Sequence, residues 1–202
     1  MNPSVPTQRP AANVFRFLDA RFDPASGRLR LAYAFDDGAP LVETLVFPEA
    51  PELRDPGRLA AFERALALLH LVAGVSYWKA TLAPRIEISD SRLNRDTPGA
   101  LPEDLSGFLE RTWRLGLGEF AWVNDVDLRA RLHVPSGPAV SVGEAADLGL
   151  HRRALVAIGG GKDSLVSLEA LRDARIDVQP VVVGASSLIA DTVAVSGLPL
   201  LR

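Results

Sequence analysis

A short apolar segment, a run of glycines and an amphipathic segment follow one another after residue 153. Residues 154–158 are all apolar, which is typical of a short buried strand. Residues 159–161 are glycines, and residues 162–164 then open a helical pattern whose apolar positions are Leu165, Leu168 and Leu171. Glycines let a backbone approach an anion closely, and the first amides of a helix lack internal partners and carry the positive end of its dipole. The order of strand, glycine turn and helix therefore predicts a phosphate-binding loop.

Two common phosphate loops do not match this segment. A Walker loop has glycine, any four residues and then Gly-Lys-Ser or Gly-Lys-Thr, but Gly161 and Lys162 are followed by Asp163, and Val156 stands five positions before Gly161. A dinucleotide-binding turn has Gly-x-Gly-x-x-Gly, but Ser164 stands where its third glycine belongs. We expect Asp163 or Ser164 to cap the helix, and the Ser164 hydroxyl to contact a phosphate oxygen.

Residues 160–164, Gly-Gly-Lys-Asp-Ser, resemble the PP-loop of the ATP pyrophosphatases. The usual form of that loop is Ser-Gly-Gly-x-Asp-Ser, so Gly159 occupies the place of its first serine. The resemblance implies that ATP is cleaved between its α and β phosphates, that a carbonyl or carboxylate oxygen is adenylated, and that pyrophosphate is released. The alternative interpretation of the residues is a glycine turn that only allows a helix to pack tightly on a strand.

The composition is that of a soluble globular protein. The chain has 202 residues, 48% of them hydrophobic and 23% charged, which is enough for one large domain or two small ones. A net charge of −3 gives no electrostatic reason to expect nucleic-acid binding. The absence of cysteine excludes disulfides, thiolate catalysis and cysteine-ligated zinc.

Two observations bear on targeting. Residues 1–12 lack a basic start followed by an apolar stretch, so they do not form a secretory signal. The most apolar run, residues 66–75, is interrupted by His70 and is too short to span a bilayer. Because ATP is the implied substrate, we expect a cytoplasmic protein.

Residues 14–134 predict an α+β domain after a flexible lead-in, residues 1–13. Strand patterns at 14–23, 28–36 and 41–47 are separated by turn residues, which predicts an antiparallel meander. Helical spacing begins at residue 58, and His70 within it is expected to be a packed core residue. A short strand is expected at 85–89, and a helix from Pro102 to about Gly116 with a buried stripe of Leu105, Phe108, Leu109 and Thr112. Residues 116–124 show no clear period, and 129–134 are expected to form another strand.

Prolines and glycines gather in residues 135–150, where we place a linker. Residues 151–202 then start a second domain, in which a strand at 177–184 is expected to pair in parallel with the first strand. A helix at 188–195 and a third strand from residue 198 follow. A nucleotide-binding sheet of this kind normally has about five parallel strands. The chain is therefore expected to be α/β. Its front domain is expected to be α+β, and its second domain to be the incomplete start of a sheet like that of the adenine nucleotide α-hydrolases. Such a chain is expected to be inactive or poorly stable alone.

Three phrases narrow the resemblance further. They are residues 73–80, Ala-Gly-Val-Ser-Tyr-Trp-Lys-Ala, residues 116–120, Gly-Leu-Gly-Glu-Phe, and residues 159–164, Gly-Gly-Gly-Lys-Asp-Ser. With the opening meander they resemble the bacterial UDP-N-acetyl-α-D-muramoyl-L-alanyl-L-glutamate epimerases, from about Val14 onward. The resemblance implies that the terminal L-glutamate of UDP-MurNAc-L-Ala-L-Glu is converted to D-glutamate in peptidoglycan precursor synthesis, with ATP and Mg²⁺ consumed. It implies a small nucleotide-sugar peptide as substrate, with neither nucleic acid nor membrane as partner.

The implied roles fall mainly on the glycine loop. The backbone amides of Gly160, Gly161 and Lys162 and the Ser164 hydroxyl would hold the β and γ phosphates. Lys162 would add positive charge to them, and Asp163 would order the loop or reach Mg²⁺ through water.

Other implied contacts lie outside the loop. Gly184 and Ala185 would border the adenosine, because they stand at the carboxyl end of the second parallel strand. Lys79 and Glu119, in the other two phrases, are candidates for the substrate side. The residue that removes the α-proton is not assigned by the sequence.

Two other functions stay open. One is another PP-loop adenylating ligase, which modifies tRNA or forms an amide. The other is a binding module without catalysis, in which Gly159 marks a degenerate loop.

Overall fold

The computed structural model describes residues 11–47, 53–90, 92, 99–138, 147–184 and 187–201. The chain divides into two compact units, Met1–Ala145 and Ala146–Arg202, each of which is described by itself. Several sequence predictions concern residues outside the described ones. These are most of the lead-in, the central part of the linker, and Ala185.

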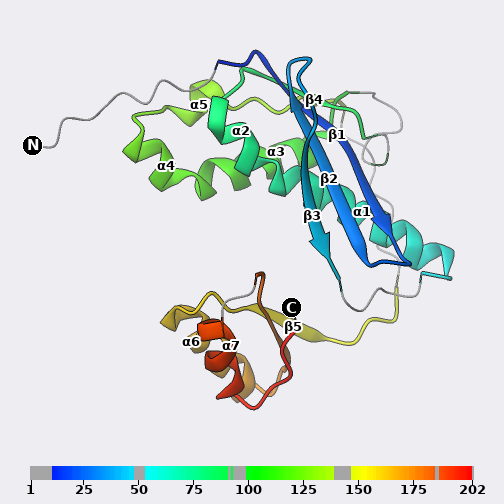
Figure 1. Ribbon diagram of the computed structural model, residues 1–202, viewed down its shortest axis with the longest axis vertical. Coiled ribbons are helices and arrows are strands. Elements are labelled where there is room, and N and C mark those ends of the chain that lie inside the picture. The colour runs from blue at the N-terminus through cyan, green and yellow to red at the C-terminus, as the bar shows by residue number, and fades with distance from the viewer. Residues whose placement is uncertain are drawn as a thin grey trace, which may run out of the picture. The chain divides into compact units, whose positions relative to one another are not determined.

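A four-stranded sheet forms one layer of the first unit (Figure 1). Its strands are β1 (Val14–Asp23), β2 (Arg28–Phe35), β3 (Leu41–Val46) and β4 (Arg85–Ile88), in the order β3-β2-β1-β4. The pairs β1–β2 and β2–β3 are antiparallel, as the meander prediction requires. β4 was expected as a strand, but its parallel pairing with β1 follows only from the tertiary structure.

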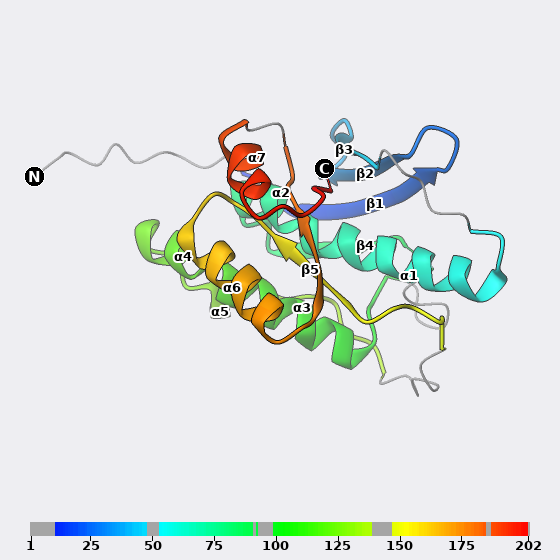
Figure 2. The same ribbon diagram turned by 90° about the horizontal axis from the view of Figure 1, so that it is seen from below.

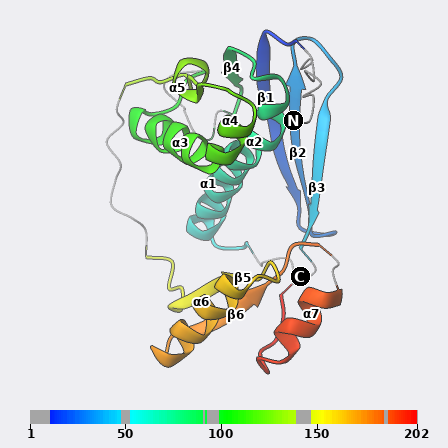
Figure 3. The same ribbon diagram turned by 90° about the vertical axis from the view of Figure 1, so that its left-hand side faces the viewer.

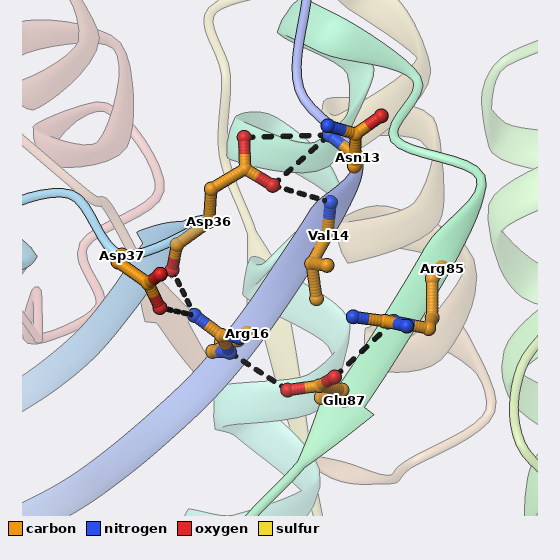
Figure 4. Close-up of polar contacts among 7 residues, drawn as sticks. All are labelled: Asn13, Val14, Arg16, Asp36, Asp37, Arg85 and Glu87. Atoms are coloured by element: carbon orange, nitrogen blue, oxygen red, sulfur yellow. Dashed lines mark hydrogen bonds and ion pairs between the residues drawn. The ribbon is translucent and has the colours of Figure 1, made fainter.

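Polar contacts fix the start of β1 between its neighbours (Figure 4). The Asp36 carboxylate, at the end of β2, accepts hydrogen bonds from the amides of Asn13 at 3.1 Å and Val14 at 2.9 Å. The guanidinium of Arg16 on β1 forms an ion pair with Glu87 on β4, with Nε and Oε2 2.7 Å apart. These contacts bind residues from three strands, so they help to set the register of β1.

Helices cover one face of this sheet (Figure 3). They are α1 (Pro56–Ala73), α2 (Val75–Thr81) and α3 (Glu103–Gly116), followed by α4 (Gly118–Val123) and α5 (Leu128–Arg131). Asp55 caps α1 by accepting a hydrogen bond from the Arg58 amide at 2.8 Å. The sheet and the helices share one apolar core, whose largest fully buried side chains include Trp78, Trp113, Tyr33, Phe15 and Phe17.

Two local predictions for this unit were wrong, and one stretch for which no structure was predicted forms a helix. The buried stripe of α3 contains Trp113, whereas Phe108 is 49% exposed, because the indole of Trp113 packs against Trp78 with ring centroids 5.5 Å apart. Residues 118–123 form α4, which is too short for its period to be visible in the sequence. Residues 128–131 form the short helix α5 in place of a strand, since Asp127 starts a helical turn by accepting a hydrogen bond from the Arg129 amide at 2.9 Å.

His70 is a core residue, as predicted, and is only 1% exposed. Its Nε2 lies 3.0 Å from the Ala32 carbonyl oxygen, and its own carbonyl accepts a hydrogen bond from the Tyr33 hydroxyl at 3.0 Å. Burial lowers the pKa of the imidazole, although the contact with Ala32 and the nearby Asp90 carboxylate oppose that effect. The folded state therefore favours the neutral form of the His70 imidazole.

This burial predicts a pH dependence of stability. The folded pKa of His70 lies below the ordinary value of about 6.5, so its contribution is fully present above that pH and is lost as the pH falls below it. Replacing His70 with glutamine, which can still donate to Ala32, is expected to flatten the slope of unfolding free energy against pH between about 6.5 and 5. Urea denaturation at each pH measures this, with His133→Gln at an exposed position as the control. An unchanged slope in His70→Gln would exclude His70 as its source.

Gly74 joins α1 to α2 where the helices cross the aromatic core. A Cβ at this position would lie 2.4 Å from Cε1 and 2.7 Å from Cζ of the Phe17 ring. The ring is fully buried and has little room to move. Glycine is therefore needed here because of the close approach of the helix to the sheet.

Replacing Gly74 with alanine is expected to cost about 1–3 kcal/mol through overpacking. Thermal unfolding measures the loss, and Gly116→Ala, whose Cβ would have open space, is the control. Adding Phe17→Leu should recover part of the loss by making room for the methyl group. If Gly74→Ala were as stable as the unmodified protein, the close packing of α1 and α2 on β1 would be wrong.

In the described part of the chain, one helical stretch, Pro56–Thr81, is long and apolar enough to cross a membrane by length and composition. The apolar run at residues 66–75 is only part of this stretch, because α1 and α2 together extend well beyond it. Leu66, Leu71 and Trp78 of this stretch belong to the core that the helices share with the sheet. Core helices of globular domains pass the same test of length and composition.

The second unit contains two parallel strands and two helices (Figure 2). β5 (Arg153–Ala157) pairs with β6 (Asp177–Val181), and α6 (Lys162–Asp173) connects them. After α7 (Ser187–Ala194), Leu201 forms a parallel bridge with Val181. The predicted parallel pairing is confirmed, and both helices pack on one small core made of Val156, Ile158, Leu168, Val178, Val182 and Val193.

Candidate functional site

The glycine turn lies between the carboxyl end of β5 and the first residue of α6. Gly160 has φ +83°, and a Cβ there would lie 3.3 Å from Cγ1 of Ile189 on α7. Gly159 and Gly161 are exposed, and a Cβ on either would meet no atom within 4 Å. The turn therefore requires glycine for its conformation at Gly160 and leaves open space beside Gly159 and Gly161.

The predicted capping of the helix was wrong. The N-cap of α6 is Gly161, and no described side chain caps the helix. Asp163 lies two residues beyond the N-cap, inside the first turn, and the Ser164 hydroxyl donates a hydrogen bond to the Gly161 carbonyl at 2.8 Å. Because no side chain occupies them, the first amides of this twelve-residue helix are open to an anion.

The charged residues of the loop are exposed. Lys162 and Asp163 occupy the first turn of α6, where a carboxylate is favoured by the helix dipole. The described residues contain no group of three or more His, Asp or Glu side chains that could hold a metal ion. Asp163 is thus a single carboxylate at the open end of the helix.

Gly184 follows β6 and is exposed with φ +104°. Because β5 and β6 are parallel, their carboxyl ends lie at the same edge of the sheet, so Gly184 stands on the same edge as the glycine turn. Ala185, predicted with Gly184 to border a nucleoside, lies outside the described residues.

Lys79 and Glu119 belong to the first unit. Lys79 is half-buried in the last turn of α2, and Glu119 is exposed in the first turn of α4. Both residues are described, and no hydrogen bond or ion pair joins them. The structure gives each of them a place on a helix of the first unit.

A second candidate site lies among α3, α4 and α5, where the sequence had singled out only residues 116–120 with Glu119. A shallow depression of about 500 Å³ contains Arg114 and Arg129 among its lining residues, and a neighbouring one of about 390 Å³ contains Trp122 and Asp125. They share Ala121, Val126 and Asp127, so we treat them as one surface, the α3–α5 groove. Sequence reasoning missed this groove, because a strand was expected where α5 forms.

The protein therefore belongs to the class of mixed α/β proteins. It has two compact units, and its second unit has an open glycine turn at a helix N-terminus. The chain belongs to the MurL N-terminal domain family, whose family model matches residues 6–202. The relationship inferred from the three sequence phrases is thereby confirmed.

Three curated relatives carry the name UDP-N-acetyl-alpha-D-muramoyl-L-alanyl-L-glutamate epimerase. The protein of Xanthomonas oryzae pv. oryzae is 41% identical over 190 residues, which cover 94% of this chain. The proteins of Salinispora tropica and a Micromonospora species are each 34% identical, covering 94% and 92% of this chain. The matched region is 40% of the length of each relative. No solved structure matches the chain.

Proposed function

We propose that this chain supplies the ATP-using loop of an epimerase that converts the terminal L-glutamate of UDP-MurNAc-L-Ala-L-Glu to D-glutamate. The observation that carries the proposal is the uncapped N-terminus of α6 behind three glycines, in a chain that belongs to this family. The names of the relatives supply the substrate and the epimerisation. The use of ATP rests on the resemblance of residues 159–164 to a PP-loop.

The chemistry explains why an epimerase would use ATP. An ionised carboxylate resists loss of its α-proton, because a second negative charge would develop beside the first. Adenylation neutralises the carboxylate and makes the carbonyl an electron sink, so a general base can remove the proton. Reprotonation from the opposite face inverts the centre, and hydrolysis of the acyl-adenylate then makes the outcome irreversible.

Several residues of the loop would bind the phosphates, each through a different group. The amides of Gly160, Gly161 and Lys162 would bind the β and γ phosphates, since the first amides of α6 have no side-chain cap. The Ser164 hydroxyl would exchange its bond to the Gly161 carbonyl for one to a phosphate oxygen. Gly159 would let the phosphates approach without a side-chain contact.

The rest of the nucleotide would lie along the same edge of the sheet. Lys162 would add positive charge, and Gly184, with Ala185, would border the adenosine. A Mg²⁺ ion bound to the phosphates would have Asp163 as its protein carboxylate, directly or through water. That single carboxylate fits an ion whose other ligands are phosphate oxygens and water.

The remaining parts of the proposal concern the substrate side and the compartment. Lys79 and Glu119 are proposed to face the nucleotide-sugar peptide. The reaction uses ATP and a soluble nucleotide-sugar, so we propose the cytoplasm as its compartment, with no nucleic acid or membrane as partner.

Pyrophosphate release by the complete natural protein tests the proposal. Release is expected when ATP, Mg²⁺ and UDP-MurNAc-L-Ala-L-Glu are all present, together with D-glutamate in the recovered dipeptide. Release that depends instead on tRNA, or on ammonia with a carboxylic acid, would assign the loop to another adenylating ligase. Failure to bind ATP at all would indicate a binding module without catalysis.

A further inference from the structure

The α3–α5 groove carries charge and aromatic surface that the folded unit does not use. Arg114 and Arg129 line one half of it, and within the part of the chain that the structure describes neither guanidinium has an ion pair or a side-chain hydrogen bond. By contrast, seven arginines elsewhere form ion pairs with carboxylates: Arg16, Arg21, Arg30, Arg85, Arg92, Arg153 and Arg172. Two unpaired guanidinium groups in one concave surface are suited to an anion with several oxygens.

The other half of the groove is aromatic and acidic. Trp122 is 87% exposed, although the other two tryptophans, Trp78 and Trp113, are fully buried in the core. An exposed indole is a stacking surface for a nucleic-acid base. The Asp125 carboxylate lines the same half and can accept a hydrogen bond from a ring N–H.

The two halves are joined and differ in charge. Ala121, Val126 and Asp127 line both, so one ligand can reach from the arginines to the indole. Asp127 adds negative charge at the junction, but its Oδ1 already accepts a hydrogen bond from the Arg129 amide at 2.9 Å. A ligand that matches this order has an anionic group at one end and a flat ring with an N–H donor at the other.

From this order we propose that the α3–α5 groove binds the uridine diphosphate part of the substrate. Arg114 and Arg129 hold the diphosphate, Trp122 stacks on the uracil, and Asp125 accepts a hydrogen bond from the uracil N3–H. Each of the two depressions, of about 500 and 390 Å³, is by itself in the size range of small-ligand sites. The inference rests on the proposed function, because uridine diphosphate enters through the substrate named for the relatives.

Calorimetric titration of the complete natural protein with UDP and with CDP tests this directly. Cytosine has a lone pair at N3 where uracil has N–H, so the Asp125 carboxylate should favour UDP by about tenfold or more. The change Asp125→Asn should remove most of that preference, since an amide can donate or accept. Equal binding of UDP and CDP, or no binding of UDP at millimolar concentration, would overturn the proposal.

Variants of the other groove residues complete the test. The double change Arg114→Gln with Arg129→Gln, and separately Trp122→Leu, should each weaken UDP binding by about tenfold or more. The control is Arg111→Gln on α3, which is exposed and does not line the groove and should leave UDP binding unchanged. Unchanged UDP binding in both groove variants would overturn the proposal.

Turnover separates this inference from the proposed function. If the groove is the substrate site, the double arginine variant should raise the KM for UDP-MurNAc-L-Ala-L-Glu with little change in the KM for ATP. An unchanged KM for the sugar nucleotide in an active variant would reject the groove and leave the epimerase standing. UDP binding by an unmodified protein that releases no pyrophosphate would support the groove and reject the epimerase.

Discussion

Replacing Gly161 with alanine is expected to lower ATP-dependent pyrophosphate release by about 100-fold or more. In the structure a Cβ at this position meets no atom within 4 Å, so the methyl group would extend into the space proposed for the phosphates. The backbone at Gly161 has φ −85° and ψ 155°, which alanine adopts readily. The loss should therefore come from blocked phosphate binding, with at most about 1 kcal/mol of lost stability at the N-cap position.

The experiment uses the complete natural protein and follows pyrophosphate release together with thermal unfolding. Gly107→Ala is the matched control, because Gly107 is exposed within α3 and its Cβ would also have open space. That change should leave the rate unaffected and raise stability by about 0.5–1 kcal/mol through better helix propensity. A Gly161→Ala protein that keeps its full rate would show that this turn does not hold the phosphates.

Replacing Trp78 with alanine should have the largest effect on stability. Trp78 is fully buried, its Nε1 donates a hydrogen bond to the Ala83 carbonyl at 3.0 Å, and its ring packs on Trp113. Truncation would leave a large cavity and an unpaired carbonyl, so the free energy of unfolding should fall by about 3–5 kcal/mol. That is a large part of the about 5–15 kcal/mol by which native domains are stable.

Urea denaturation monitored by circular dichroism measures this loss. Trp122→Ala is the control, since its side chain is 87% exposed, and it should change stability by no more than about 0.5 kcal/mol. The two variants remove the same atoms, so the difference between them reports the burial of Trp78 together with its hydrogen bond to the Ala83 carbonyl. Similar stabilities for both variants would contradict the packing of α2 between the sheet and α3.

The sequence predicted elements best where local patterns were strong. Period-two alternation over 28–35 and the turn residues around it predicted β2 and the meander. Leu29, Leu31 and Tyr33 share one buried face of that strand, and the opposite face begins with the exposed Arg28 and Arg30. His70 was correctly expected in the core, since a histidine within an apolar helical run has few ways to reach solvent. Prediction failed at α4 and α5, where six and four residues are too few to show a period.

The candidate sites divide in the same way. The glycine turn before α6 was visible in the sequence, because backbone conformation at Gly160 and the start of a helix depend on neighbouring residues. The α3–α5 groove was not visible, because Arg114 and Arg129 lie on separate helices and only folding places them on one surface. The spacing of these two arginines in the sequence matches no known ligand-binding motif.

By itself the sequence determined the family, the meander, and the parallel strands with a glycine turn between them, since these depend on short-range patterns of apolar, glycine and turn residues. Only the tertiary structure decided that β4 joins β1 in parallel, that Gly74 meets the Phe17 ring, and that two arginines and an exposed tryptophan share a groove. Such contacts join residues far apart in the chain, and packing of whole elements selects them.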